Sequence, residues 1–338
     1  MTSANTAAGS ASEKAGITYA SAGVDVEAGD LAVELMKDAV KATHNSSVIG
    51  GVGGFAGLYD VSRLLTYKKP LLATSTDGVG TKVAIAQAMD IHDTIGFDLV
   101  GMVVDDIVVV GAEPLYMTDY IACGKVVPER IAGIVRGIAA ACSVAGTALV
   151  GGETAEHPGL LGEHEYDVAG AATGVVEADA LLGPDRVRAG DVVIGMASSG
   201  LHSNGYSLVR RVINHAGWAL DRQVSELGRT LGEELLEPTR VYAADCLDLA
   251  RAFPVTARRR CTASATSPAA GWQPTWPASC RRAWWPPWTA PPGNCPPSSS
   301  WCPSWAMSRW PTWSAPSTWA SAWLPSCRRR QRTPLSPA

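Results

Sequence analysis

The chain has 338 residues with 28 basic and 32 acidic side chains, and its formal net charge at pH 7 is −4. This length allows two domains with buried cores, and no apolar run approaches the length of a membrane span, which argues against an integral membrane protein. Residues 1–16 are rich in Ser, Ala and Gly and are expected to be disordered. They lack the basic and apolar regions of a secretion signal, which favours a cytoplasmic protein.

The composition changes abruptly near residue 257. Residues up to 256 carry a net charge of −14, whereas residues 257–338 hold ten Arg, no acidic residue, no Val, no Ile and 11 of the 12 Trp. We interpret this second segment as an aberrant, disordered tail. A reading-frame slip in G+C-rich DNA is our hypothesis for it, because Trp codons read one base back encode Leu, Val or Met. A basic, Trp-rich segment that binds nucleic acid is the alternative, and we favour it less.

Helices and strands alternate in residues 17–177, which we expect to form an amino-terminal domain of α/β (α+β) class. Apolar spacing predicts a first helix at 28–42, with Gly29 and Asp30 as its capping residues. The run 93–114 is ambiguous, because its β-branched content suggests a strand and its length suggests a helix. The remaining expected elements are strands at 70–74, 115–124, 147–152 and 166–176 and helices at 81–89 and 128–146.

Residues 178–256 read as the first part of a carboxy-terminal domain that the tail truncates. Turn residues precede a predicted strand at 192–197, and the loop 198–205 leads into a helix closed by Gly217. A further helix is predicted at 238–253.

The first candidate site is the glycine-rich stretch "IGGVGGFAG". It is either a mobile cover over phosphate groups or a flexible surface loop, and it is not a Walker loop because no GK[ST] follows. The glycines concerned are Gly50, Gly51, Gly53 and Gly54.

The second is "TDGVGTK", which follows a predicted buried strand. Gly78 and Gly80 let the backbone approach an anion, the next helix offers free N–H groups, and Lys82 adds a positive charge. Asp77 would repel a bare phosphate, so its presence fits a bound Mg²⁺ ion. A capped helix after a turn remains the alternative.

Acidic residues also interrupt two apolar runs. Asp105 and Asp106 lie within 93–114, where an unpaired buried carboxylate would be costly, and a helix would place Asp98 on the same face as Asp105. Metal binding or a salt-bridged pair would satisfy them. In "VGGETAEHPG", Glu153 and Thr154 lie at a strand end, where α/β proteins commonly bind ligands.

The loop "SSGLHSNG" offers a polar clamp ahead of a helix. His202, Ser203 and Asn204 could contact a substrate there, or the loop could simply cap the helix. Together the acidic clusters, the lysine and the glycine turns describe a site for a nucleoside triphosphate and a metal.

These motifs, with "DDIVVVGAEP", "YDVAG", "GLHSNGYSLVR" and "PTRVY", resemble the phosphoribosylformylglycinamidine cyclo-ligase family over residues 17–256. The resemblance implies ATP-dependent closure of formylglycinamidine ribonucleotide to aminoimidazole ribonucleotide in purine biosynthesis. It also implies a homodimer whose amino-terminal strands form a shared barrel, with neither nucleic acid nor membrane as a partner. A related synthetase or kinase of the same superfamily, or an inactive nucleotide-binding remnant, is the alternative.

By the same resemblance, site residues fall into four groups. Catalysis would involve Lys82, His202 and Asn204, and His202, Ser203 and Asn204 would contact substrate. The metal ligands would be Asp77, Asp98, Asp105, Asp106 and Glu153. ATP would be bound by Gly50, Gly51, Gly53, Gly54, Thr76, Gly78, Gly80, Thr81, Lys82, Gly152 and Thr154.

Overall fold

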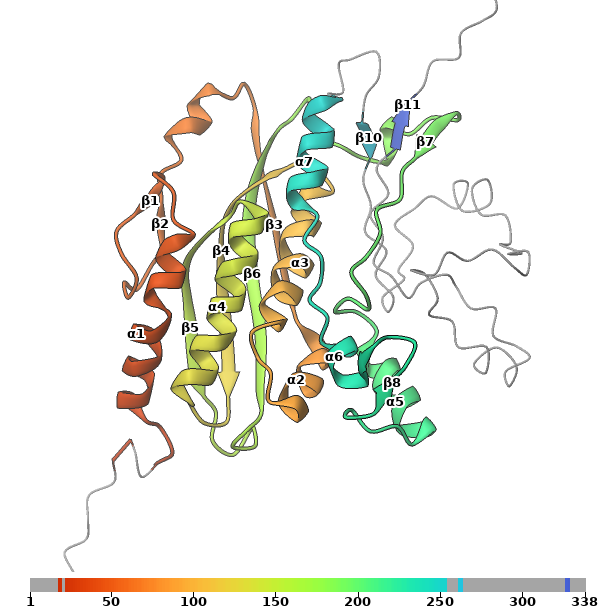
Figure 1. Cartoon of the computed structure of the whole chain (residues 1–338). Coiled ribbons are helices and arrows are strands. Elements are labelled where there is room, and N and C mark those ends of the chain that lie inside the picture. The colour runs from red at the N-terminus through yellow and green to blue at the C-terminus, as the bar shows by residue number, and fades with distance from the viewer. Residues whose placement is uncertain (1–17, 20–21, 254–260, 264–325, 329–338) are drawn as a thin grey trace, which may run out of the picture.

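The computed structural model describes residues 18–19, 22–253, 261–263 and 326–328 (Figure 1). Its centre is a four-stranded sheet in the order β3-β6-β4-β5. The strands are β3 (Pro70–Gly78), β4 (Glu113–Cys123), β5 (Ala148–Glu156) and β6 (Tyr166–Glu177). β6 pairs antiparallel with both β3 and β4, and β4 pairs parallel with β5. The chain is therefore of mixed α/β class, as the sequence predicted.

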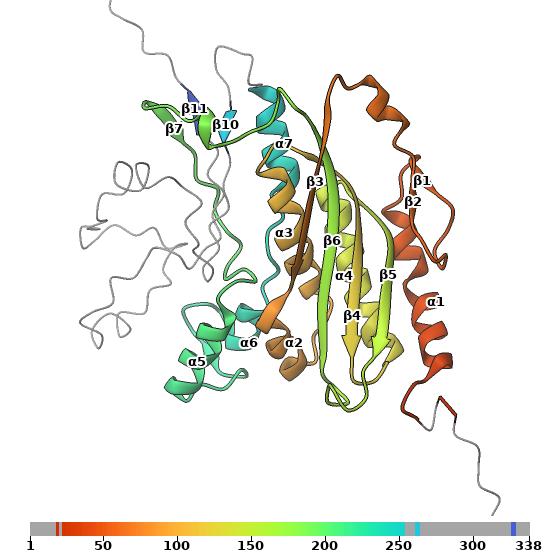
Figure 2. The same cartoon turned by 180° about the vertical axis from the view of Figure 1, so that it is seen from behind.

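Two helices cover one face of this sheet, and a third packs on them. α3 (Ile95–Val108) and α4 (Pro128–Ala145) lie against the strands, and α1 (Val26–Ala42) lies along α4 (Figures 1 and 2). The ambiguous run 93–114 is thus mainly helical, because its apolar side chains are buried around most of the helix. Pro128 begins α4 and Gly146 ends it in the left-handed conformation.

α3 and α4 approach each other unusually closely. A Cβ atom placed on Gly96 would lie 2.1 Å from the backbone nitrogen of Ile138, and one on Gly137 would lie 1.9 Å from the carbonyl oxygen of Asp93. Glycine at both positions is therefore what allows the start of α3 to reach the backbone of α4.

The other face of the sheet is uncovered in the described chain (Figure 2). Side chains of β3 alternate between half-buried and exposed, and Leu72 is 65% exposed while Tyr120 of β4 is 41% exposed. An apolar sheet face of this kind is typical of a protein contact. The predicted barrel shared by two subunits is consistent with it and stays a prediction.

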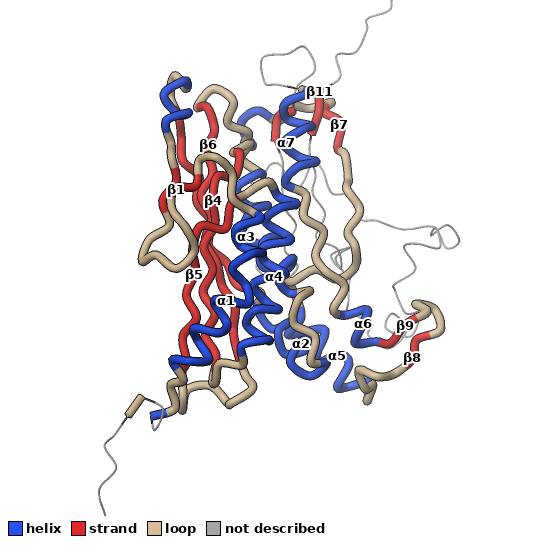
Figure 3. Tube along the Cα trace, turned by 60° about the vertical axis from the view of Figure 1, so that its left-hand side comes forward, coloured by secondary structure: helices blue, strands red, loops and turns tan. Residues whose placement is uncertain are grey.

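The second part of the chain has shorter strands. β7 (Asp191–Val193) pairs with β11 (Ser326–Arg328), which pairs with β10 (Cys261–Ala263). The helices are α5 (Tyr206–Ala216), α6 (Leu231–Leu235) and α7 (Ala243–Ala252), and β8 (Gln223–Val224) pairs with β9 (Arg229–Thr230). Figure 3 shows α5 and α6 beside α2 (Val83–Met89) at one end of the molecule. The short elements β1 (Val48–Ile49), β2 (Leu58–Tyr59), η2 (Ser62–Thr66), η3 (Gly80–Lys82) and η4 (Pro184–Arg186) complete the fold.

Four sequence predictions need correction. α1 is capped by Asp25, whose side chain accepts a hydrogen bond from the Ala28 backbone, and not by Gly29 or Asp30. The strand predicted at 192–197 ends at Val193, and the helix predicted at 238–253 begins only at Ala243. Within the tail, residues 261–263 and 326–328 form strands, where disorder was expected. The predictions for residues 1–16 and for the rest of 257–338 lie outside the described residues.

Among the helices that the structure describes, none combines the length and the apolarity that a bilayer span requires.

Candidate functional site

The structure brings the loop at the end of β3 against the loop before α5. We call residues 76–82 the nucleotide loop and residues 199–205 the substrate loop. Ser203 Oγ donates a hydrogen bond to the carbonyl oxygen of Val79 at 2.6 Å, and Thr81 Oγ1 lies 3.1 Å from Ser207 Oγ. Two motifs about 120 residues apart in the sequence therefore form one site.

Lys82 lies at the base of this site and is fully buried. Its Nζ donates hydrogen bonds to Asp98 Oδ1 at 2.8 Å and to the carbonyl oxygen of Glu237 at 2.7 Å, and it lies 5.4 Å from the centre of the Tyr206 ring. Protein groups therefore enclose the ammonium group, as a buried charge requires. The phosphate contact expected of Lys82 from the sequence stays a prediction.

Asp98 and Asp105 do share one face of α3, as the helical spacing predicted. Asp98 Oδ1 accepts hydrogen bonds from Lys82 and from Thr239 Oγ1, and burial raises the pKa of this carboxyl group while Lys82 opposes the rise. Asp105 accepts from the backbone nitrogen of Tyr242. Both side chains therefore hold residues 237–242 against α3.

His202 is neutral at pH 7, because burial lowers its pKa to about 4 and the nearby charges of Lys82 and Arg240 act in the same direction. Its Nε2 accepts hydrogen bonds from the backbone nitrogens of Ser199 and Arg240, so the ring proton is on Nδ1. Nδ1 is buried and has no partner among the described residues. A neutral donor of this kind is suited to bind a carbonyl or phosphoryl oxygen.

Asn204 lies next to His202 in the substrate loop. Its side-chain nitrogen is 3.4 Å from Met102 Sδ of α3. A thioether is a weak acceptor, so the amide remains able to bind a stronger one.

The carboxylates expected to bind one metal ion lie on different elements: Asp77 and Glu153 on the sheet, and Asp98, Asp105 and Asp106 on α3. One row of paired residues crosses the four strands, and it consists of Asp77 (β3), Gly170 (β6), Asp119 (β4) and Gly152 (β5). Glu153 is thus displaced from Asp77 by three strand spacings, or about 14 Å. The described residues contain no group of three or more His, Cys, Asp or Glu side chains placed to hold a metal.

This arrangement still fits Mg²⁺ carried by ATP. In such sites Mg²⁺ keeps several waters and uses one or two carboxylates together with the phosphates. Asp77 is half-buried at the strand end, and its Oδ1 accepts a hydrogen bond from the following backbone nitrogen. Asp106 and Glu153 are exposed, whereas Asp98 and Asp105 are engaged by residues 237–242.

The glycine-rich loop lies at the opposite edge of the sheet from the nucleotide loop. It connects β1 to β2, and Gly57 lies against β5, since a Cβ there would be 2.5 Å from the Val150 carbonyl oxygen. Gly50 and Gly53 have φ angles of 92° and 102°, which other residues rarely adopt. Gly51 and Gly54 complete this exposed loop. Gly152 and Thr154 belong to β5, the strand at the same edge of the sheet as this loop. Thr76 is exposed at the other edge.

Sequence reasoning missed Asp119, which lies in the row between Asp77 and Gly152. Burial raises the pKa of Asp119 to about 7. A Cβ on Gly152 would lie 2.2 Å from Asp119 Oδ1, so this glycine makes room for the carboxylate. The signal was available, since an acidic residue with alternating apolar neighbours in a buried strand is unusual.

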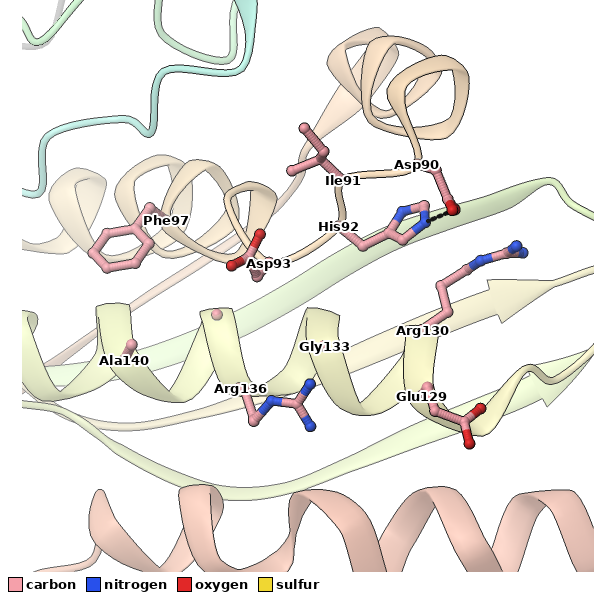
Figure 4. Close-up of a pocket in the computed structure, with 11 residues that line it drawn as sticks. Asp90, Ile91, His92, Asp93, Phe97, Glu129, Arg130, Gly133, Arg136 and Ala140 are labelled. Carbon is pink, nitrogen blue, oxygen red and sulfur yellow. Dashed lines mark hydrogen bonds and ion pairs between the residues drawn. The ribbon is translucent and has the colours of Figure 1, made fainter. Parts of the chain in front are cut away.

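A separate cavity of about 480 Å³ lies between residues 90–93 and α4 (Figure 4). Arg130 and Arg136 line it, and His92 contacts Asp90 at its edge. None of the site residues predicted from the sequence lines this cavity.

Residues 58–176 match the model of the AIR synthase related protein, N-terminal domain, and residues 188–265 match that of its C-terminal domain. The phosphoribosylformylglycinamidine cyclo-ligase of Geobacillus sp. (strain WCH70) is 56% identical over 238 residues, which cover 70% of this chain and 68% of that protein. The chain belongs to the phosphoribosylformylglycinamidine cyclo-ligase family. The cyclo-ligase of Alkaliphilus oremlandii is 52% identical over 240 residues, covering 71% of this chain and 70% of that protein.

Membership of this family confirms the sequence-based expectation of an ATP-dependent ligase of purine biosynthesis. The match to the cyclo-ligase of Geobacillus kaustophilus covers 65% of that protein. Thiamine-monophosphate kinase from Stenotrophomonas maltophilia is similar in structure, with a TM-score of 0.48 and 20% identity over 69% of this chain and 66% of that one. The carboxy-terminal family match ends at residue 265, close to the break in composition.

Proposed function

We propose that the chain closes the imidazole ring of aminoimidazole ribonucleotide at the expense of ATP. The γ-phosphoryl group of ATP is transferred to the formyl amide oxygen of formylglycinamidine ribonucleotide, and ADP leaves. The amidine nitrogen then attacks the activated carbon, loses a proton and displaces phosphate. The observation that carries this proposal is the hydrogen-bonded contact between the nucleotide loop and the substrate loop.

Such chemistry depends on positioning and on neutralising charge more than on covalent catalysis. Gly80 and Thr81, just after β3, would hold the phosphates through backbone N–H groups, while Gly78, whose own N–H is donated to Asp77 Oδ1, would let the phosphates approach the backbone. Mg²⁺ would enter with ATP and bind Asp77, where it would neutralise charge on the transferred phosphoryl group.

The substrate loop would bind the ribonucleotide. The Nδ1–H of His202 has no partner in the described chain, and the Asn204 amide has only a weak one, so both can bind substrate oxygens. The Ser203 hydroxyl is committed to Val79 and would fix the loop, leaving its backbone for the substrate.

A homodimer would complete the site. The glycine-rich loop and Glu153 lie at the edge of the sheet opposite the nucleotide loop, so a single subunit does not bring them together. A second copy packed on the uncovered sheet face could do so, which supports the expected dimer.

Phosphate release with formylglycinamidine ribonucleotide and MgATP tests the activity of the purified chain. Asp77→Asn should lower turnover by at least about 100-fold, because the Mg²⁺ ligand is lost. Lys125→Met is the control and should change nothing, since the exposed Lys125 forms a salt bridge with the exposed Glu163. Equal turnover of Asp77→Asn and the control would contradict the metal role.

The altered composition beyond residue 257 favours a second candidate, a nucleotide-binding protein without turnover. Calorimetric binding of MgATP without any phosphate release, in the same preparation, would select it over the ligase.

Mixing variants tests the shared site. Asp77→Asn and Glu153→Gln chains, each inactive alone, should recover about a quarter of the activity when refolded together, because half of the dimers then carry one intact site. No recovery, in a sample shown by light scattering to be dimeric, would contradict a site shared between subunits.

A further inference from the structure

Residues 237–242 form an extended segment that lies along α3 and joins α6 to α7; we call it the strap. Three residues of α3 face it, and these are Asp98, Gly101 and Asp105. They are three and four positions apart and therefore lie on one face of the helix.

The strap fits this face closely. Thr239 Oγ1 donates to Asp98, and the backbone nitrogen of Tyr242 donates to Asp105 at 3.2 and 3.3 Å. Between these two contacts Gly101 leaves room for the strap, because a Cβ there would lie 2.6 Å from Thr239 Cγ2.

Lys82 connects the nucleotide loop to the same strap. Its Nζ donates to Asp98 on α3 and to the strap carbonyl of Glu237, at 2.8 and 2.7 Å. The ion pair is completely buried on both sides. Removing one partner of such a pair leaves an uncompensated charge, which strongly disfavours the docked state.

The strap in turn holds the substrate loop. Ser199 Oγ donates to the carbonyl oxygen of Pro238 at 2.6 Å, and the backbone nitrogen of Arg240 donates to Ser199 Oγ at 3.1 Å. The same nitrogen lies 3.4 Å from His202 Nε2. A continuous set of contacts thus runs from Lys82 through Asp98 and the strap to His202.

We infer that Lys82, Asp98 and Thr239 are positioning residues that fix the substrate loop against the nucleotide loop by docking the strap, and that Lys82 does not bind an ATP phosphate. The fully buried and hydrogen-bonded ammonium group carries this inference. The inference rests on the proposed function for the roles of the two loops. It assigns Lys82 a positioning role in place of the phosphate contact expected from the sequence.

Two variants separate positioning from phosphate contact. Gly101→Ala keeps Lys82 but pushes Thr239 away from α3, although alanine alone would favour the helix. The combined variant Lys82→Met, Asp98→Leu and Thr239→Val removes the charges together and leaves an apolar contact of similar volume, which often preserves packing.

Calorimetric titration with MgATP gives the first readout. We expect Gly101→Ala to weaken binding about tenfold or more, because the substrate loop no longer supports the nucleotide loop through Ser203. The combined variant should bind within about threefold of the wild type. The opposite pattern, tight binding by Gly101→Ala and loss in a correctly docked combined variant, would overturn the inference.

Hydrogen exchange of peptides covering 199–205 and 237–242 gives a readout that needs no ATP. Lys82→Met alone should speed exchange in both peptides about 100-fold, although Lys82 donates to Asp98 and Glu237 and not to residues 199–205 in the described chain. The combined variant should restore protection. Unchanged exchange at 199–205 in Lys82→Met and Gly101→Ala would overturn the inference.

The two readouts also separate the two proposals. If the wild type binds no ATP, the proposed function fails, and the exchange pattern still decides the positioning role. If the combined variant does not dock, Gly101→Ala decides alone: faster exchange supports the inference, and exchange at the wild-type rate overturns it.

Discussion

The two parts of the chain that match the family are held together in different ways. The first, residues 58–176, contains four strands of 9 to 12 residues and two helices packed on one face. The described residues of the second, from 188, contain strands of two or three residues. Its helix α7 packs on α3 and α4, and its strap docks on α3. We therefore expect the second part to depend on the first for its structure more than the first depends on the second.

Gly96→Val is the test of this dependence with the largest expected effect. The new side chain would collide with the backbone of α4 near Ile138, so we expect the free energy of unfolding to fall by about 4 kcal/mol or more. Because α3 also carries the strap, both parts should unfold in one transition, measured by urea denaturation with probes in each part.

Gly29→Ala is the control for this substitution. Gly29 lies in α1 with nothing within 4 Å of a new Cβ, so alanine should stabilise the chain by roughly 0.5–1 kcal/mol. A loss of stability at Gly29 similar to that at Gly96 would show that the helix contact is not the cause.

Asp119→Asn probes the buried carboxyl group of the first part. Burial raises its pKa from 3.8 to about 7, so its contribution to stability is complete below about pH 3.8 and is lost as the pH rises through 7. The free energy of unfolding of the wild type should therefore fall by up to about 3 kcal/mol between pH 5 and pH 8. The variant should not show this fall. Urea unfolding at both pH values measures it, and parallel pH profiles would refute the assignment.

His202→Gln probes the second part and should act in the opposite direction. The native pKa of His202 is about 4 against 6.5 for the unfolded chain, so its contribution is complete above pH 6.5 and is lost as the pH falls toward 4. The wild type should therefore lose up to about 3 kcal/mol more than the variant between pH 7 and pH 4. Exchange at 199–205 measures this locally, and an acid loss equal in both chains would argue against a buried neutral histidine.

The sequence predicted the first part well because its apolar residues recur at the regular spacing of strands and helices. Period-two and helical spacing located β3, β4, β6 and α4 within a few residues, and Pro128 marked the start of α4 as expected. It left 93–114 open because a helix buried on nearly all sides has no polar face to reveal its period.

The site was predicted only in part, for a different reason. Glycine and polar motifs identified the two loops, but the burial of Lys82 depends on Glu237, which lies 155 residues away. The strap was predicted as helix because "PTRVY" continues the apolar spacing of α7, whereas Asp98 and Asp105 hold it extended. Such long-range pairing overrides local propensity and leaves no local pattern.

The smallest expected effect is at α6, which sequence spacing did not predict although it carries a capping box. Thr230 Oγ1 accepts from the backbone nitrogen of Glu233, and Glu233 Oε2 accepts from the backbone nitrogen of Thr230. Thr230→Ala should cost about 1 kcal/mol, whereas Thr230→Ser should cost only a few tenths. If the second part depends on the first, this loss should appear as faster exchange within 231–236 while protection in β4 and β6 is unchanged. Equal acceleration in the sheet would mean that the two parts stabilise each other, and the one-way dependence would be wrong.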